Sequence, residues 1–273
     1  MSVDYGLQGH VAVITGSTSG IGQALARALA EQGVNVVLNG FGDPAQIEAD
    51  RLAMQNATNA AVRYHGADMT KPSEITDLIN YAVSEFGRLD ILVNNASAIS
   101  LTGTLETPMK KYDLMHQVNA RGTFLCAQAC LPHLLKSENP HVLTLSPPLN
   151  VEARWFENHV AYSMAKFGMS LCTLGMSAEF KGKVAFNALW PKTIIATAAI
   201  EFAIGNAQML QLARKPSIMA DAAAAILQRD AKSVSGHFYI DEEVLAEEGV
   251  SDFSSYRVNP NTPENQLIPD FFI

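Results

Sequence analysis

Short β-branched runs alternate with longer segments of helical spacing along most of this chain. That alternation is typical of βαβ units and predicts a parallel sheet. The runs are apolar and mostly bounded by turn residues, as expected for strands that are buried on both faces. The predicted strands are residues 11–15, 35–39, 62–65, 91–94, 141–146, 184–189 and 237–240.

Apolar positions at helical spacing fill the segments between these strands. The predicted helices are residues 21–32, 45–56, 73–86, 112–135 and 162–180. Helices on both faces of a parallel sheet make a doubly wound, Rossmann-type three-layer sandwich of the α/β class. Residues 147–159 and 191–215 follow strand ends, where open α/β sheets bind ligands, so both are candidate substrate loops. The second of them is mostly helical in composition. From residue 242 onward we expect an extended tail packed on the body or on a neighbouring subunit.

Composition excludes several classes of protein. The chain is 48% hydrophobic and 17% charged, which argues against disorder. Its formal net charge of −8 disfavours a nucleic-acid partner. The chain has three cysteines, an odd number that argues against a disulfide framework. Cys126 and Cys130 are interpreted as core residues, so no metal site is expected. With no long apolar run and no basic leader, we expect no membrane span or secretion and take the cytoplasm as the default location.

A glycine-rich turn, TGSTSGIG at residues 15–22, lies directly between the first strand and the first helix. Its glycines let the backbone approach a pyrophosphate, whose charge then sits at the positive end of the helix. Such a turn can also be merely structural. The strand before it and the helix after it favour nucleotide binding.

Several motifs in order resemble the classical short-chain dehydrogenase/reductase family. They are the TGxxxGIG turn, the NNA sequence at residues 94–96, Asn119, and a YxxxK pair at Tyr162 and Lys166, with Ser97 where the family has glycine. The resemblance covers about residues 11–240. It implies a seven-stranded sheet in the order 3-2-1-4-5-6-7, and a homodimer or homotetramer formed through the helices at 112–135 and 162–180. We treat 1–273 as one domain, with 1–140 mainly binding cofactor, 141–241 carrying the catalytic and substrate loops, and 242–273 as the tail.

The resemblance also implies a nicotinamide cofactor, NAD or NADP. Ser19 and Phe41 stand where NADP-binding members carry a cation, and Gly40 stands where NAD-binding members carry an acid, with Asp43 a little further on. The absent cation favours NAD over NADP. The implied cofactor-binding residues are Gly16, Ser17, Ser19, Gly20, Ile21, Gly22, Phe41, Asp68, Met69, Asn94, Ala96, Tyr162, Lys166, Pro191, Ile194 and Thr197.

Tyr162 and Lys166 are four residues apart, so on a helix they face the same way. A cation about 4 Å from the phenol would lower its pKa by up to about 3, towards the operating pH. Tyr162 would then exchange a proton with an alcohol or ketone while hydride moves to or from the nicotinamide. By resemblance, Lys166 also holds the nicotinamide ribose and Asn119 anchors a water that relays the proton. Alone, a Tyr and a Lys one turn apart are a common helix-surface pair.

The family's catalytic serine is displaced in this chain. Pro147 takes its place on the fifth strand, and Ser146 lies one residue early. One residue along a strand reverses the direction of the side chain, although the two prolines that follow could bend the backbone. Ser146 is the candidate, with Thr144 and His159 as lesser alternatives.

Two finer resemblances point to different substrates. The first half, with NGFGD at 39–43, resembles bacterial D-3-hydroxybutyrate dehydrogenases, and the second half, with SPPLN at 146–150, resembles hydroxysteroid dehydrogenase-like proteins. The positions that hold the small carboxylate in the first group are occupied here by Ile99, Pro148, His159 and Thr193. A carboxylate would be left unpaired in such a pocket, so the small hydroxy acid is kept only as an alternative.

Ile99, Trp155, His159 and Trp190 are the predicted substrate contacts. They suggest a larger, apolar alcohol or carbonyl compound of a fatty-acyl, terpenoid or steroid-like kind, although aromatic residues also pack loops onto a core. Lys192 would meet an acidic ligand group or stay solvated. An alternative of another class is an NAD(H)-binding sensor or partner protein with weak or lost catalysis, which the displaced serine favours and the intact Tyr162 and Lys166 oppose.

Overall fold

A computed structural model describes residues 6–198 and 209–273 of the chain. Its centre is a parallel sheet of seven strands in the order β3-β2-β1-β4-β5-β6-β7, which confirms the predicted topology. The strands are β1 (Val11–Ile14), β2 (Asn35–Asn39), β3 (Val62–His65), β4 (Ile91–Asn94), β5 (His141–Thr144), β6 (Ala185–Trp190) and β7 (Phe238–Ile240). β1, β4 and β5 are buried along their whole length, as their apolar sequences require.

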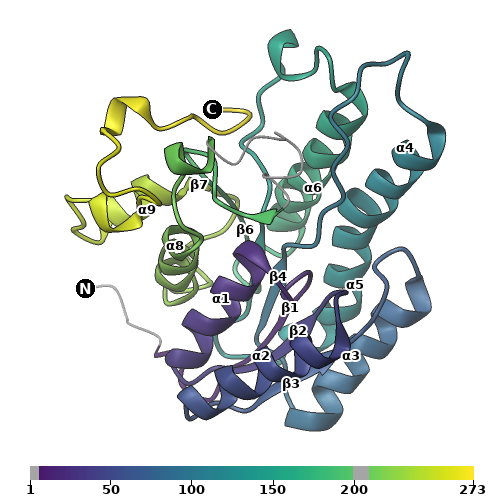
Figure 1. Ribbon diagram of the computed structural model, residues 1–273. Helices are drawn as coiled ribbons and strands as arrows, with labels where there is room; N and C mark the ends of the chain where they lie inside the picture. Colours follow the sequence, from purple (N-terminus) through teal and green to yellow (C-terminus); the bar gives the residue numbers. More distant parts are fainter. Residues whose placement is uncertain (1–5, 199–208) are drawn as a thin grey trace.

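Helices cover both faces of the sheet (Figure 1). One core joins the sheet to α1, α2 and α8, and the other joins it to α3, α5 and α6. The helices are α1 (Gly20–Glu31), α2 (Pro44–Ala57), α3 (Pro72–Phe86), α4 (Met109–Met115), α5 (Gly122–Leu134), α6 (Val160–Glu179), α8 (Ser217–Leu227) and α9 (Asp241–Glu247). Cys126 and Cys130 lie in the second core, where burial raises the pKa of the Cys126 thiol to about 12.

Three helical predictions need correction. The predicted helix 112–135 is divided, because a π-helical turn at His116–Arg121 separates α4 from α5. Helix α8 was not predicted, since it is alanine-rich and buried almost all round, which leaves no polar face to mark a helical period. In the loop predicted to be mostly helical, Ile195 forms a bridge with Arg214 and Met209–Leu212 forms a short 3₁₀ turn; residues 199–208 lie outside the described part.

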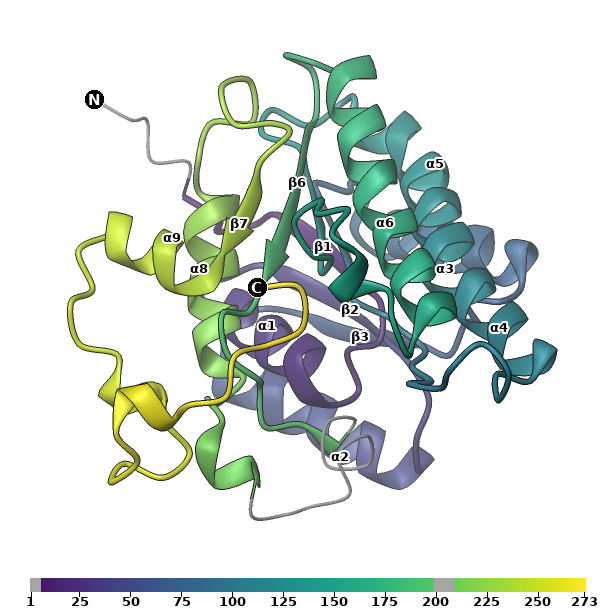
Figure 2. The ribbon, with the colours of Figure 1, turned by 90° about the horizontal axis from the view of Figure 1, so that it is seen from above.

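The chain beyond β7 packs on the body, although it begins as helix α9 rather than as an extended tail. Its last part, residues 262–273, is called the tail segment below, and Figure 2 shows it crossing the carboxyl end of β6. The fully buried Arg214 binds Glu242 and Glu264, and Arg257 binds Glu264 at 2.9 Å. These ion pairs hold the segment that leads to the carboxyl edge of the sheet.

Candidate active site

The glycine turn after β1 presses against the end of β4. Gly16 has a φ of +64°, and a Cβ there would lie 2.8 Å from the Cα of Ala96. A Cβ on Gly22 would lie 2.5 Å from Nδ2 of Asn95. The Asn95 amide in turn donates to the carbonyl oxygens of Thr15 and Gly16 at 2.9 and 2.8 Å. Only glycine therefore fits at these two positions, and the turn is held close to the NNA sequence.

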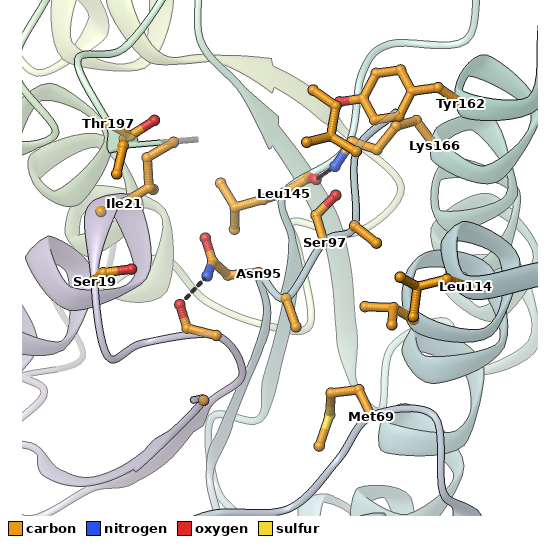
Figure 3. Close-up of a pocket in the computed structure, with 18 of the residues that line it drawn as sticks. Ser19, Ile21, Met69, Asn95, Ser97, Leu114, Leu145, Tyr162, Lys166 and Thr197 are labelled. Carbon is orange, nitrogen blue, oxygen red and sulfur yellow. Dashed lines mark hydrogen bonds between the residues drawn. The ribbon is translucent and has the colours of Figure 1, made fainter. Parts of the chain in front are cut away.

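A cavity of about 1230 Å³ runs from this turn to the first part of α6. Figure 3 shows Ser19, Ile21 and Thr197 on one side of it and Tyr162 and Lys166 on the other. The volume exceeds the roughly 300–1,000 Å³ of a pocket for one drug-sized molecule, so it suits a dinucleotide with a second molecule. The predicted site residues that line it are Gly16, Ser19, Gly20, Ile21, Phe41, Asp68, Met69, Ala96, Ile99, Tyr162, Lys166, Trp190, Pro191, Ile194 and Thr197.

Asp68 keeps its charge at one end of the cavity. The backbone N–H and the hydroxyl of Thr70 both donate to its Oδ1 at 2.8 Å, and these bonds, with the Lys71 cation, lower the pKa of the carboxyl. Asp43 has a different task, since it accepts the N–H of Gln46 at 2.9 Å and caps α2. The acid that follows Gly40 a little further on is therefore used to begin α2.

Lys166 and Tyr162 stand one turn apart on α6 and are both buried. Lys166 Nζ donates to the carbonyl oxygen of Leu145 at 2.7 Å and lies 4.9 Å from the centre of the Trp190 ring. Burial lowers the pKa of Lys166 to about 7, although the charge of Asp270 acts in the opposite direction. Burial also raises the pKa of Tyr162, and Asp270 adds to that shift. The pKa of the phenol is therefore raised rather than lowered as expected, because burial and the charge of Asp270 both act in that direction.

Asn119 lies on the π-helical turn between α4 and α5, fully buried. Its Oδ1 accepts the N–H of Ala98 at 2.7 Å, and its Nδ2 donates to the carbonyl oxygen of Ala98 at 3.0 Å. Such turns widen a helix and are frequent at functional sites. Here the turn directs an amide that clamps the loop after β4, the loop that carries Ile99 into the cavity.

Ser146 lies beside the cavity but does not line it. Its Oγ is buried and has no hydrogen-bond partner among residues 6–198 and 209–273. Leu145, the preceding residue, lines the cavity instead. Side chains on an extended chain alternate in direction, so the cavity side at this point falls to leucine. The structure thus gives Ser146 no contact with the space where a substrate would react.

The family model for short chain dehydrogenases matches residues 10–203. The chain belongs to the short-chain dehydrogenase family. It is 49% identical over 280 residues to hydroxysteroid dehydrogenase-like protein 2 of Danio rerio, covering 98% of this chain and 64% of that protein. A putative dehydrogenase from Xanthomonas campestris shares 47% identity and a TM-score of 0.91, with 98% of each chain covered. A short chain dehydrogenase from Mycobacterium thermoresistibile shares 36% identity and a TM-score of 0.89, covering 98% and 96%.

The likeness to solved short chain dehydrogenases agrees with the family that the model shows. The likeness to hydroxysteroid dehydrogenase-like protein 2 runs through both halves of the chain, which overturns the alternative of a D-3-hydroxybutyrate dehydrogenase. The chain spans 64% of the length of that relative. Across residues 6–198 and 209–273, no helix has the length and apolarity that crossing a membrane requires.

Some predicted site residues of this dehydrogenase lie outside the cavity lining: Ser17, Gly22, Asn94, Asn119, Ser146, Trp155 and His159. Ser17 Oγ donates to the carbonyl oxygen of Ile14 at 2.7 Å and accepts the N–H of Asn39 at 3.0 Å, so it joins β1 to β2. Trp155 and His159 pack around Phe272 rather than facing the cavity. These side chains support the walls of the site.

Sequence reasoning missed several residues that line the cavity, above all Asn95, Leu145, Asp270 and Phe271. Asn95 could have been found, since it is the second Asn of the NNA motif. The last two were taken for a tail, and no local pattern shows that the tail segment returns to α6.

Proposed function

We propose that this short-chain dehydrogenase transfers hydride between NAD and a secondary alcohol or ketone of a largely apolar substrate. The observation that carries the proposal is that Tyr162 and Lys166 share one cavity with the glycine turn at the start of α1. Nucleotide-binding and proton-transferring groups are thus open to the same space.

The residues present fit a dinucleotide. Gly16 and Gly20 line the cavity at the amino end of α1, where backbone N–H groups and the helix dipole favour phosphate. Met69 and Phe41 give apolar surface further along, beside the charged Asp68. When bound, the nicotinamide would supply or accept the hydride.

The chain's own residues account for the proton. Because burial raises the pKa of Tyr162, its phenol is neutral at physiological pH and can donate to the oxygen of a ketone that is being reduced. The hydrogen bond to Leu145 fixes the position of Lys166, whose charge below about pH 7 favours the phenolate that remains. The arrangement favours reduction at neutral pH.

The preference for NAD rests on Ser19 and Phe41. Both line the cavity, and Phe41 is 68% exposed, so neither offers a cation to a 2′-phosphate. The apolar character of the substrate rests on Ile99, Leu101 and Trp190, which line the Tyr162 part of the cavity.

The test is a panel of NADH and NADPH oxidation with medium-chain ketone esters, terpenoid and steroid ketones, and acetoacetate. We expect turnover of at least one apolar ketone, faster with NADH, and little turnover of acetoacetate. Turnover of acetoacetate above all the apolar ketones would overturn the substrate class.

A second candidate is an NAD(H)-binding sensor or partner protein, which the withdrawal of Ser146 from the cavity favours. Without a hydroxyl at that wall, the substrate oxygen loses one hydrogen-bond donor. Saturable NADH binding with no turnover across the whole panel would support this second function.

We also infer a homodimer or homotetramer. Phe124 on α5 and Met164, Leu171 and Leu174 on α6 are large apolar side chains that are 44–58% exposed. Contact with a second copy would remove them from water. Light scattering should give a mass of two or four chains, and a monomer at micromolar concentration would contradict the inference.

A further inference from the structure

The tail segment forms a fixed wall at the Tyr162 end of the cavity. Ile194 N donates to the Ile268 carbonyl oxygen at 2.9 Å, and Asp270 N donates to that of Lys192 at 3.0 Å. On the other side, the Trp190 indole donates to the Phe271 carbonyl oxygen at 2.7 Å. The backbone is therefore held both before and after Asp270.

Phe272 anchors the end of this wall. Its ring is 3% exposed and lies 5.2 Å from that of Phe167 and 5.8 Å from that of Trp190, centre to centre. Its φ of +73° is unusual for a side chain of this size and carries backbone strain, which the surrounding aromatic packing must offset. A backbone held in that conformation indicates that the tail segment has a fixed position on the body of the protein.

The wall brings a carboxyl group to the reacting end of the site. Asp270 lines the cavity together with Tyr162 and Lys166, and its neighbours there are the apolar Trp190, Ile194 and Phe271. Burial raises the pKa of Asp270 to about 7, and Asp241 acts in the same direction, against the Phe271 N–H and the Lys166 cation. Above that pH the carboxyl is charged.

Lys166 and Lys192, the two lysines beside the tail segment, are already engaged. Lys166 Nζ is bonded to the Leu145 carbonyl oxygen, lies 3.6 Å from the Met169 sulfur, and faces the Trp190 ring. Lys192, an alternative partner for an acidic ligand, binds Glu242 at 2.6 Å. A substrate carboxylate arriving beside Tyr162 would therefore meet a like charge, while Lys166 and Lys192 have other partners. Lys110 and Lys111 of α4 also line the cavity.

We propose that Asp270 is a specificity-determining residue that excludes substrates with a carboxylate near the reacting carbon and admits neutral ones. This inference rests on the proposed function, because it takes the ketone to react at Tyr162 in the cavity that Asp270 also lines. A like charge beside a substrate carboxylate adds repulsion, and the apolar side chains around Asp270 offer that carboxylate no hydrogen bond. The device selects by rejecting the wrong substrate.

The test compares 3-oxooctanoate with its methyl ester, two substrates with the same reacting ketone, at pH 8 with NADH. In wild type we expect kcat/KM for the ester to exceed that for the acid at least tenfold. In Asp270→Asn that ratio should fall at least tenfold, and in Asp270→Glu, which keeps the charge, it should persist. Because each ratio is measured on one enzyme, a general loss of activity cancels. A ratio unchanged in Asp270→Asn would overturn the proposal.

A binding measurement separates this inference from the proposed function. Trp190 lines the cavity and Trp155 packs on Phe272, and these are the chain's two tryptophans, so their fluorescence reports on this end without turnover. Wild type should bind methyl octanoate at least tenfold more tightly than octanoate. Asp270→Asn should bind the two compounds about equally. Equal binding to wild type contradicts the role of Asp270, whereas absent turnover with the expected binding contradicts only the redox reaction.

Discussion

Lys166 Nζ donates a hydrogen bond to the backbone carbonyl oxygen of Leu145 at 2.7 Å, which joins α6 to the end of β5. Leu145 also lines the cavity. It directly precedes Ser146, the residue that the resemblance made the candidate for a hydroxyl near the substrate. The residue that directly follows β5 thus orients the lysine and makes this wall of the site apolar.

The rate of ketone reduction should fall as the pH rises through about 7. Burial lowers the pKa of Lys166 to about that value, so the lysine is charged below it and neutral above it. Tyr162 keeps its proton over the same range because its pKa is raised. The measurement is kcat/KM for a neutral ketone with NADH from roughly pH 5.5 to 9.

Asp270→Asn provides the control for that profile. The charge of Asp270 raises the pKa of Lys166. Removing that charge should therefore move the fall in kcat/KM at alkaline pH to a lower pH. A fall that moves to higher pH would show that another group controls it.

Replacing Gly16 with alanine should damage both stability and nucleotide binding. The position has a φ of +64° and an added Cβ would lie 2.8 Å from the Ala96 backbone. We expect a loss of about 1–3 kcal/mol in the free energy of unfolding, measured with urea, and weaker NADH binding. Gly6→Ala is the matched control, since a Cβ there meets nothing within 4 Å. Equal stability of the two variants would contradict the close packing of the turn.

Phe41→Arg should raise the affinity for NADPH relative to NADH by at least tenfold. Phe41 is exposed and lines the cavity, so an arginine would have room to reach a 2′-phosphate. The readout is the ratio of the two dissociation constants from cofactor fluorescence. If the ratio stays at its wild-type value, the adenine ribose of the cofactor does not bind beside Phe41.

Asn119→Ala should destabilise the loop after β4. The substitution leaves the half-buried N–H and carbonyl oxygen of Ala98 without the amide that pairs them, and we expect a loss of about 1 kcal/mol or more in the free energy of unfolding. Urea unfolding measures the loss, and Asn80→Ala, on an exposed position of α3, is the control. A loss no larger than that of the control would mean that the clamp contributes nothing.

Local patterns predicted the sheet well because each strand is short, β-branched and bounded by turns. The strand bounds differ from the prediction by at most two residues, at the end of β5. Helix α8 escaped because burial on nearly all sides removes the periodicity that marks an amphipathic helix. The glycine turn was predicted from its place between a strand and a helix, and Tyr162 and Lys166 from the resemblance of several motifs in order to those of the family.

Asp270 could not be found in this way, because its place beside Lys166 depends on a chain that returns from β7 to α6. The bonds from Lys192 and Trp190 to the tail segment are long-range and leave no local pattern. Ser146 failed for a related reason: a shift of one residue on an extended chain reverses the side chain, and the sequence left open whether the prolines would restore it.

The central claim is that Tyr162 gives the proton during hydride transfer in this cavity. The most direct test is NADH oxidation with methyl 3-oxooctanoate by wild type and Tyr162→Phe, together with NADH binding by fluorescence. We predict that kcat falls at least 100-fold in the variant, since acid–base catalysis contributes about 10²–10⁴-fold, while NADH still binds. Turnover by Tyr162→Phe at the wild-type rate would contradict the account.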